Sequence, residues 1–102
     1  MQPPLVHVID EATADRLAEL FRALGDPHRV RIVATLLQGE CNVRALAQAI
    51  GLSESAVSHH LRHLRQLRLA RARKQGRQVF YRLDDEHIQE LLLRSLDHVQ
   101  HD

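Results

Sequence analysis

Hydrophobic side chains recur at helical spacing along the first part of the chain. Over residues 11–24 they lie three and four positions apart, and Gly25 interrupts the pattern. Asp26 and Pro27 are typical of a helix cap and of a first helical position, and a second apolar stripe follows them until Gly39. The pattern therefore predicts two helices, the second beginning at Pro27.

Two further helical segments follow with only Gly51 and Leu52 between them. The first covers residues 43–50, and the second begins after Ser53, which is typical of a helix cap. In the second segment, Val57 and the leucines that follow it at helical spacing form an inward face. Two helices joined by a tight glycine turn are typical of a helix-turn-helix.

The apolar period then changes from helical to alternating. Residues 69–74 and 79–83 flank Gln75-Gly76-Arg77-Gln78, which predicts two strands joined by a glycine-containing turn. Residues 84–100 return to helical spacing. The expected fold is mainly α with a small β-hairpin: one winged helix-turn-helix domain over residues 11–102, preceded by an N-terminal arm over residues 1–10.

Composition supports a small helical domain inside the cell. The 102 residues suffice for one hydrophobic core, and with 44% hydrophobic but only 3% aromatic residues that core must consist mainly of aliphatic side chains. The single cysteine, Cys41, excludes an intrachain disulfide, and residues 1–10 lack the apolar run of a signal peptide. No segment approaches the ~20 apolar residues that cross a bilayer. We therefore expect a cytoplasmic protein that does not span a membrane.

The formal charge of +1 conceals an uneven distribution. Eight basic residues lie between positions 62 and 82 without an acidic one: Arg62, Arg65, Arg68, Arg71, Arg73, Lys74, Arg77 and Arg82. Acidic residues follow at once, beginning with Asp84 and Asp85. A basic stripe of this kind fits a surface that faces phosphates, although a solvated charged surface is the alternative.

A helix-turn-helix followed by a basic hairpin predicts contact with double-stranded DNA. The second helix of the pair would enter the major groove, which is ~12 Å wide, and the hairpin would lie against the sugar-phosphate backbone. The candidate contacts are Ser53, Ser55, Ser58, His59 and Arg62 on the helix, and Lys74, Gln75 and Arg77 at the hairpin. The alternative is an ordinary helical hairpin whose serines serve only as caps.

The last helix carries four potential metal ligands in two pairs. His98 and His101 share a helix face, whereas Asp85 and His87 lie at the helix start. His87 and His98 are eleven residues apart, which is roughly 16 Å along a helix, against ~2 Å for a zinc-to-nitrogen bond. One chain therefore cannot close the site. If the same helix of a second copy runs antiparallel across a twofold axis, the two pairs meet in two identical four-ligand sites.

Three imidazoles and one carboxylate in a tetrahedron suit Zn(II), and Co(II) can take the same geometry. A zinc hydrolase is disfavoured, because four protein ligands leave no open position for water. With eight histidines in the chain, chance pairs are the alternative explanation. His59, His60 and His63 have similar spacing, but we expect them to meet DNA or solvent.

Three segments resemble the ArsR/SmtB family of metal-sensing repressors. They are Ala23-Leu24-Gly25-Asp26-Pro27-His28-Arg29-Val30-Arg31-Ile32, Ile50-Gly51-Leu52-Ser53-Glu54-Ser55-Ala56-Val57-Ser58-His59-His60-Leu61 and Arg73-Lys74-Gln75-Gly76-Arg77-Gln78-Val79-Phe80-Tyr81. The resemblance implies a homodimer formed through the first and last helices, which binds an inverted-repeat operator when metal-free. It also implies release by Zn(II) or Co(II) and control of metal efflux or sequestration.

The family's zinc-sensor pattern, Asp-x-His-x10-His-x2-His, is complete at Asp85, His87, His98 and His101. The thiolate pattern of some relatives is not, because Asn42 stands at the usual cysteine position and Cys41 lies one residue early. We therefore expect no soft-metal thiolate site. The alternative function is a regulator of the same fold that senses nickel or a non-metal ligand.

Overall fold

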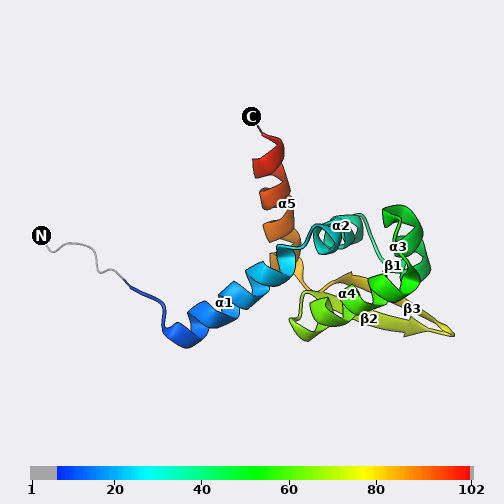
Figure 1. Ribbon diagram of the computed structural model, residues 1–102, viewed down its shortest axis with the longest axis horizontal. Coiled ribbons are helices and arrows are strands. Elements are labelled where there is room, and N and C mark those ends of the chain that lie inside the picture. Colours follow the sequence, from blue (N-terminus) through cyan, green and yellow to red (C-terminus); the bar gives the residue numbers. More distant parts are fainter. Residues whose placement is uncertain (1–6, 102) are drawn as a thin grey trace, which may run out of the picture.

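The computed structural model describes residues 7–101. Along the chain lie α1 (Glu11–Leu24), α2 (Pro27–Leu36), β1 (Cys41–Asn42), α3 (Val43–Ile50), α4 (Glu54–Gln66), β2 (Ala70–Gln75), β3 (Gln78–Leu83) and α5 (Glu86–Gln100) (Figure 1). Of the expected arm, residues 7–10 precede α1 as exposed chain outside any helix or strand, and residues 1–6 lie outside the described residues.

The predicted fold class is confirmed: five helices surround a small antiparallel sheet of strand order β1-β3-β2. The sheet has one strand more than the sequence predicted, because β1 pairs Cys41 with Tyr81 and Asn42 with Phe80. The predicted four-residue turn is also shorter in the structure. Gln75 and Gln78 pair with each other, which leaves only Gly76 and Arg77 as the turn. Gly76 has φ +62°, a conformation that glycine adopts without strain.

Each helix begins at a side chain that caps its free backbone N–H groups. Ser53 Oγ accepts a hydrogen bond from the Ala56 amide at 3.0 Å, as the sequence predicted for α4. Asp26 caps α2 by accepting from the amides of residues 28 and 29, with Pro27 as the first helical residue. The remaining caps are Asp10 for α1, Asn42 for α3 and Asp85 for α5. These local bonds explain why the helix starts were predictable.

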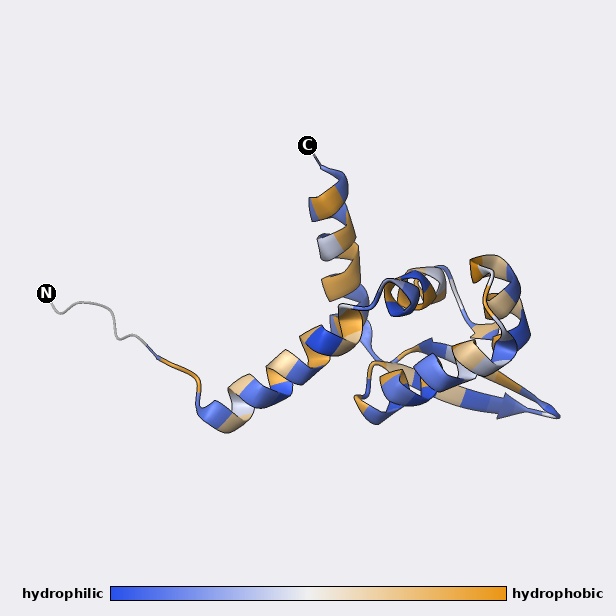
Figure 2. Ribbon diagram, viewed as in Figure 1, coloured by the Kyte–Doolittle hydropathy of each residue, from blue (hydrophilic) through white to orange (hydrophobic). Residues whose placement is uncertain are grey.

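The buried core lies among α2, α3, α4 and the sheet. Its fully enclosed side chains are Ile32, Val33, Leu46, Val57, Leu61, Leu64 and Leu69. By contrast, α1 contributes only Ala23 to the core, and α5 contributes no buried residue. Both helices project from the rest of the fold and carry hydrophobic residues along their length (Figure 2).

The projecting helices make the chain wide for its length. Its Cα radius of gyration is 16.3 Å, whereas a compact domain of about 100 residues has a radius of about 13 Å. No helix within residues 7–101 combines the length and the apolar character needed to span a bilayer.

Candidate nucleic-acid and metal sites

The α4 helix presents polar side chains on a firmly anchored backbone. Val57, Leu61 and Leu64 are completely buried and fix one face of the helix against the core. Of the predicted contacts on α4, Ser55, His59 and Arg62 are exposed, and Ser58 is half-buried. Ser53 is exposed as well, but its oxygen already accepts the cap bond, which occupies one of its two acceptor positions and leaves its hydroxyl proton free to donate to a ligand.

The β2–β3 hairpin, which we call the wing, extends away from the helices to a tip at the Gly76-Arg77 turn (Figure 1). The side chains of Lys74, Gln75 and Arg77 are exposed there. Gln75 Oε1 accepts a hydrogen bond from Arg73 Nη1 at 2.8 Å, so this amide is partly held in place. The predicted wing residues therefore lie together at the free end of the hairpin.

A contact that the sequence did not predict joins α2 to α4. Arg29 Nε donates to His60 Nδ1 at 3.1 Å, and Arg29 Nη2 lies 2.8 Å from His63 Nδ1. A guanidinium only donates, so the Nδ1 atoms of both imidazoles are the acceptors in these contacts. Burial lowers the pKa of His60, and Arg29 adds to this effect against the opposing carboxylate of Asp26. The two α4 histidines thus help to fix the angle of that helix.

The start of α5 holds the first pair of candidate metal ligands. Asp85 Oδ1 accepts a hydrogen bond from the Ile88 amide at 3.0 Å, which leaves the Oδ2 atom outside this bond. That backbone bond also lowers the pKa of Asp85, so the carboxylate is ionised, as a metal ligand must be. The Nδ1 atom of His87 lies 3.7 Å from Asp85 Oδ1, and the His87 side chain is 94% exposed. The two side chains therefore lie close together at the start of α5.

The other end of α5 holds the second pair. His98 and His101 line one open hollow of about 460 Å³ together with Asp97. Within residues 7–101, a single chain brings no three His, Cys, Asp or Glu side chains into one metal-binding group. The four predicted ligands therefore lie in two pairs at opposite ends of α5, and the described part of one chain does not bring the two pairs together.

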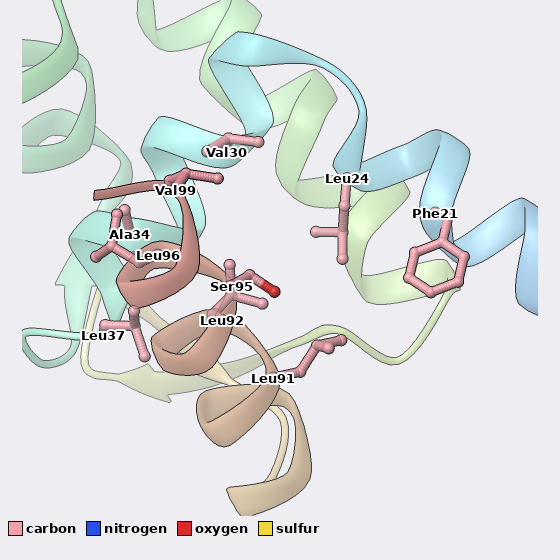
Figure 3. Close-up of a pocket in the computed structure, with 10 residues that line it drawn as sticks. All are labelled: Phe21, Leu24, Val30, Ala34, Leu37, Leu91, Leu92, Ser95, Leu96 and Val99. Atoms are coloured by element: carbon pink, nitrogen blue, oxygen red, sulfur yellow. The ribbon is translucent and has the colours of Figure 1, made fainter. Parts of the chain in front are cut away.

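Between the projecting helices lies an apolar hollow of about 330 Å³ (Figure 3). Its walls are Phe21 and Leu24 of α1, Val30 and Ala34 of α2, Leu37, and the α5 residues Leu91, Leu92, Ser95, Leu96 and Val99. Val30 belonged to the stripe that the sequence assigned to the core, but it is 41% exposed, and Phe21 is 54% exposed. These side chains are correctly spaced for burial, yet they remain exposed to this extent within residues 7–101.

Cys41 is half-buried on β1 and packs against the core. Asn42, at the position where some relatives carry a cysteine, instead caps α3 by accepting from the Ala45 amide at 2.8 Å.

Comparison with known proteins identifies the architecture. The model of the family described as "Bacterial regulatory protein, arsR family" matches residues 26–72. The "Transcriptional repressor SmtB homolog" of Synechocystis is 45% identical over 97 residues, which span 95% of this chain and 72% of the relative. The "Cadmium resistance transcriptional regulatory protein CadC homolog" of Staphylococcus aureus is 43% identical over 80% of this chain and 69% of the relative.

A solved structure gives the same fold. The homodimeric winged helix-turn-helix DNA-binding domain of Mb0332 from Mycobacterium bovis superposes with a TM-score of 0.79 and 30% identity. The match covers 89% of this chain and 88% of that one.

Proposed function

This chain belongs to the arsR family of bacterial regulatory proteins, and on that premise we propose that it is a homodimeric repressor released from its operator by Zn(II) or Co(II). The winged helix-turn-helix fold and the relatives make it a DNA-binding transcriptional regulator rather than an enzyme. In its metal-free state it would bind an inverted-repeat site in the bacterial cytoplasm and repress genes of metal efflux or sequestration.

The second copy would pack on the apolar hollow between α1 and α5. Phe21, Leu96 and Val99 are 54%, 40% and 73% exposed, and burying such side chains stabilises an association by roughly 25 cal/mol for each Å² removed from water. The homodimer of the Mycobacterium bovis domain supports this arrangement. Two copies related by a twofold axis place two α4 helices about one turn of DNA apart, which requires a palindromic operator.

In each subunit, Ser55, Ser58, His59 and Arg62 would face the base edges of the major groove, with Ser53 at the helix start. Lys74, Gln75 and Arg77 would contact the backbone from the wing tip. Hydroxyl and imidazole groups can form hydrogen bonds with base edges, whereas contacts to phosphates position the protein without reading sequence. The exposure of these side chains on an anchored helix and at the free end of a hairpin supports this assignment.

The observation that carries the metal assignment is the placement of two half-sites at opposite ends of α5, a helix without a buried residue. Asp85 and His87 of one copy would join His98 and His101 of the other. This donor set suits tetrahedral Zn(II) or Co(II), which when bound supplies four coordinate bonds that link the two subunits. The Staphylococcus aureus relative is named for cadmium resistance, which supports a metal as the effector.

Metal and DNA would oppose each other through the dimer geometry. A ligand shifts an equilibrium between two arrangements only by its difference in affinity for them. The Ile88 amide already orients the Asp85 carboxylate, so closing the site requires the α5 helices to adopt one relative position. We infer that this position separates the two α4 helices by a distance that does not fit both operator half-sites.

A titration of operator binding with a panel of metals tests the proposal. The metal-free protein should bind duplex DNA from upstream of its own gene, and Zn(II) should release it. His98→Ala should bind the same DNA and ignore Zn(II), whereas Gln100→Ala, an exposed neighbour on α5, should respond as the unaltered protein does. Release of His98→Ala by Zn(II) would refute the site. Release by Ni(II) alone, or by no metal, would instead favour the same-fold regulator of nickel or of a non-metal ligand.

A further inference from the structure

A second basic feature lies at the base of the wing, away from its tip. An open hollow of about 640 Å³ is lined by the end of α4, the chain that follows it and the first part of the wing. Its charged side chains are Arg65, Arg68, Arg71, Arg73, Arg82 and Asp84. We call this feature the wing-root hollow.

The arginines of the wing-root hollow outnumber the carboxylates that pair with them. Arg71 Nε lies 2.6 Å from Asp84 Oδ1, and Arg73 Nε lies 3.1 Å from Glu40 Oε2. Within residues 7–101, the other three arginines of the hollow have no carboxylate oxygen within 4.0 Å. Three guanidinium groups are therefore available to an anionic ligand.

Two features of the hollow oppose folding. Arg71 and Arg82 stand directly opposite each other on β2 and β3, and like charges at opposed positions of a sheet destabilise it. Arg68 has φ +59° and is the one residue other than glycine with a positive φ in the described chain. A side chain in this conformation costs about 1 kcal/mol, which glycine would avoid. A bound anion would offset the charge repulsion, and it would explain why an arginine rather than a glycine stands at position 68.

We propose that the wing-root hollow binds phosphate groups of the DNA backbone beside the segment that α4 and the wing tip contact. Guanidinium groups bind phosphate oxygens through paired, charge-assisted hydrogen bonds. Arg65 follows Arg62 by three residues on the same face of α4, and Arg73 Nη1 donates a hydrogen bond to Gln75 Oε1 of the wing tip at 2.8 Å. The hollow thus continues the surface assigned to DNA, which favours a long polyanion over a small one. This inference rests on the proposed DNA binding but not on metal sensing.

The variants Arg68→Gly and Arg82→Gln test the inference, with Arg94→Gln as the matched control. Glycine removes the Arg68 charge and relieves its backbone strain, so we expect this variant to remain folded, which its melting temperature checks. Arg94 pairs with Glu90 on α5 at 2.9 Å and lies outside the hollow. Binding of metal-free protein to operator and to an unrelated duplex is measured by fluorescence anisotropy between 50 and 200 mM salt.

Each lost phosphate contact should reduce the slope of log affinity against log salt by about 0.9. When the salt rises from 50 to 200 mM, the factor by which the variant loses affinity should be about 3.5 times smaller than the factor for the unaltered protein. At low salt the variants should lose affinity for the operator and for the unrelated duplex by similar factors, because backbone contacts carry no sequence information. Unchanged slopes in both hollow variants, or a loss confined to the operator, would overturn the inference.

Pyrophosphate separates the two possible sources of phosphate. If it raises the melting temperature of the unaltered protein but not of Arg68→Gly, while the DNA slopes stay equal, the hollow takes free phosphates and the assignment to DNA is wrong. Failure of the proposed function would give a different result. If the protein is not an operator-binding repressor, the unaltered protein itself would show no preference for its operator.

Discussion

Asp85 has a structural task at the start of α5 that can be separated from its proposed task as a metal ligand. Its Oδ1 atom accepts the Ile88 amide proton at 3.0 Å and caps a helix that has no buried side chain. Ile88 and Leu92 are the α5 side chains that pack against the core, and both are only partly buried, so the cap should contribute measurably to the stability of the first turn. Replacing Asp85 by alanine removes both the cap and the ligand, whereas asparagine removes the carboxylate but keeps a capping oxygen.

Loss of an aspartate cap costs about 1 kcal/mol, within a range of roughly 0.5–2 kcal/mol, and asparagine caps about as well as aspartate. For a domain of this size, 1 kcal/mol corresponds to about 4–8 °C in melting temperature. Metal-free Asp85→Ala should therefore melt about 4–8 °C below the unaltered protein, and Asp85→Asn should melt close to it. Neither variant should release the operator at the Zn(II) concentration that releases the unaltered protein, because a neutral amide is a poor substitute for the carboxylate ligand.

Thermal unfolding followed by circular dichroism, in chelator and at one fixed protein concentration, measures the first effect, since the stability of a dimer depends on concentration. Operator release on addition of Zn(II) measures the second. Equal melting temperatures for Asp85→Ala and Asp85→Asn would refute the capping argument. Zn(II) release of Asp85→Asn at the normal concentration would refute the role of Asp85 as a ligand.

Three further outcomes follow from the same structure. The pKa of His60 is lowered from 6.5 in the folded protein, so as the pH falls the unfolded chain binds a proton at this histidine before the folded chain does. The free energy of unfolding should therefore be highest above about pH 6.5 and should fall as the pH drops through the folded-state pKa. Denaturant unfolding at pH 7.5 and 5.5 should show a smaller pH effect in His60→Gln, and an equal effect would contradict the assignment. Leu96→Arg should convert the dimer to monomers in sedimentation and weaken operator binding; an unchanged mass would place the interface elsewhere. Leu64→Ala, at a fully buried position, should lower the free energy of unfolding by about 2–5 kcal/mol, and a loss below about 1 kcal/mol would be inconsistent with the described core.

The helices of this protein were predictable because their signals are local. A capping residue acts on amides two or three positions away, and an apolar stripe repeats every three or four residues. Asp26 therefore marked the start of α2, and Gly51 and Ser53 marked the helix-turn-helix, before the structure was known. The two-residue strand β1 is too short for an alternating pattern, and its pairing with β3 depends on residues about forty positions away. No pattern along the chain predicted this strand.

The candidate sites divide in the same way. The spacing of His98 and His101, and of Asp85 and His87, is local to α5, so the sequence alone determined the two ligand pairs on which the proposed metal site rests. Only the tertiary structure decided that Arg29 meets His60 and His63, and that Arg68 and Arg82 face one hollow. It also distinguished the buried Leu64 from the exposed Leu96, which occupy equivalent places in their helical stripes. Periodicity shows which face of a helix is apolar, but the packing of distant segments determines what covers that face.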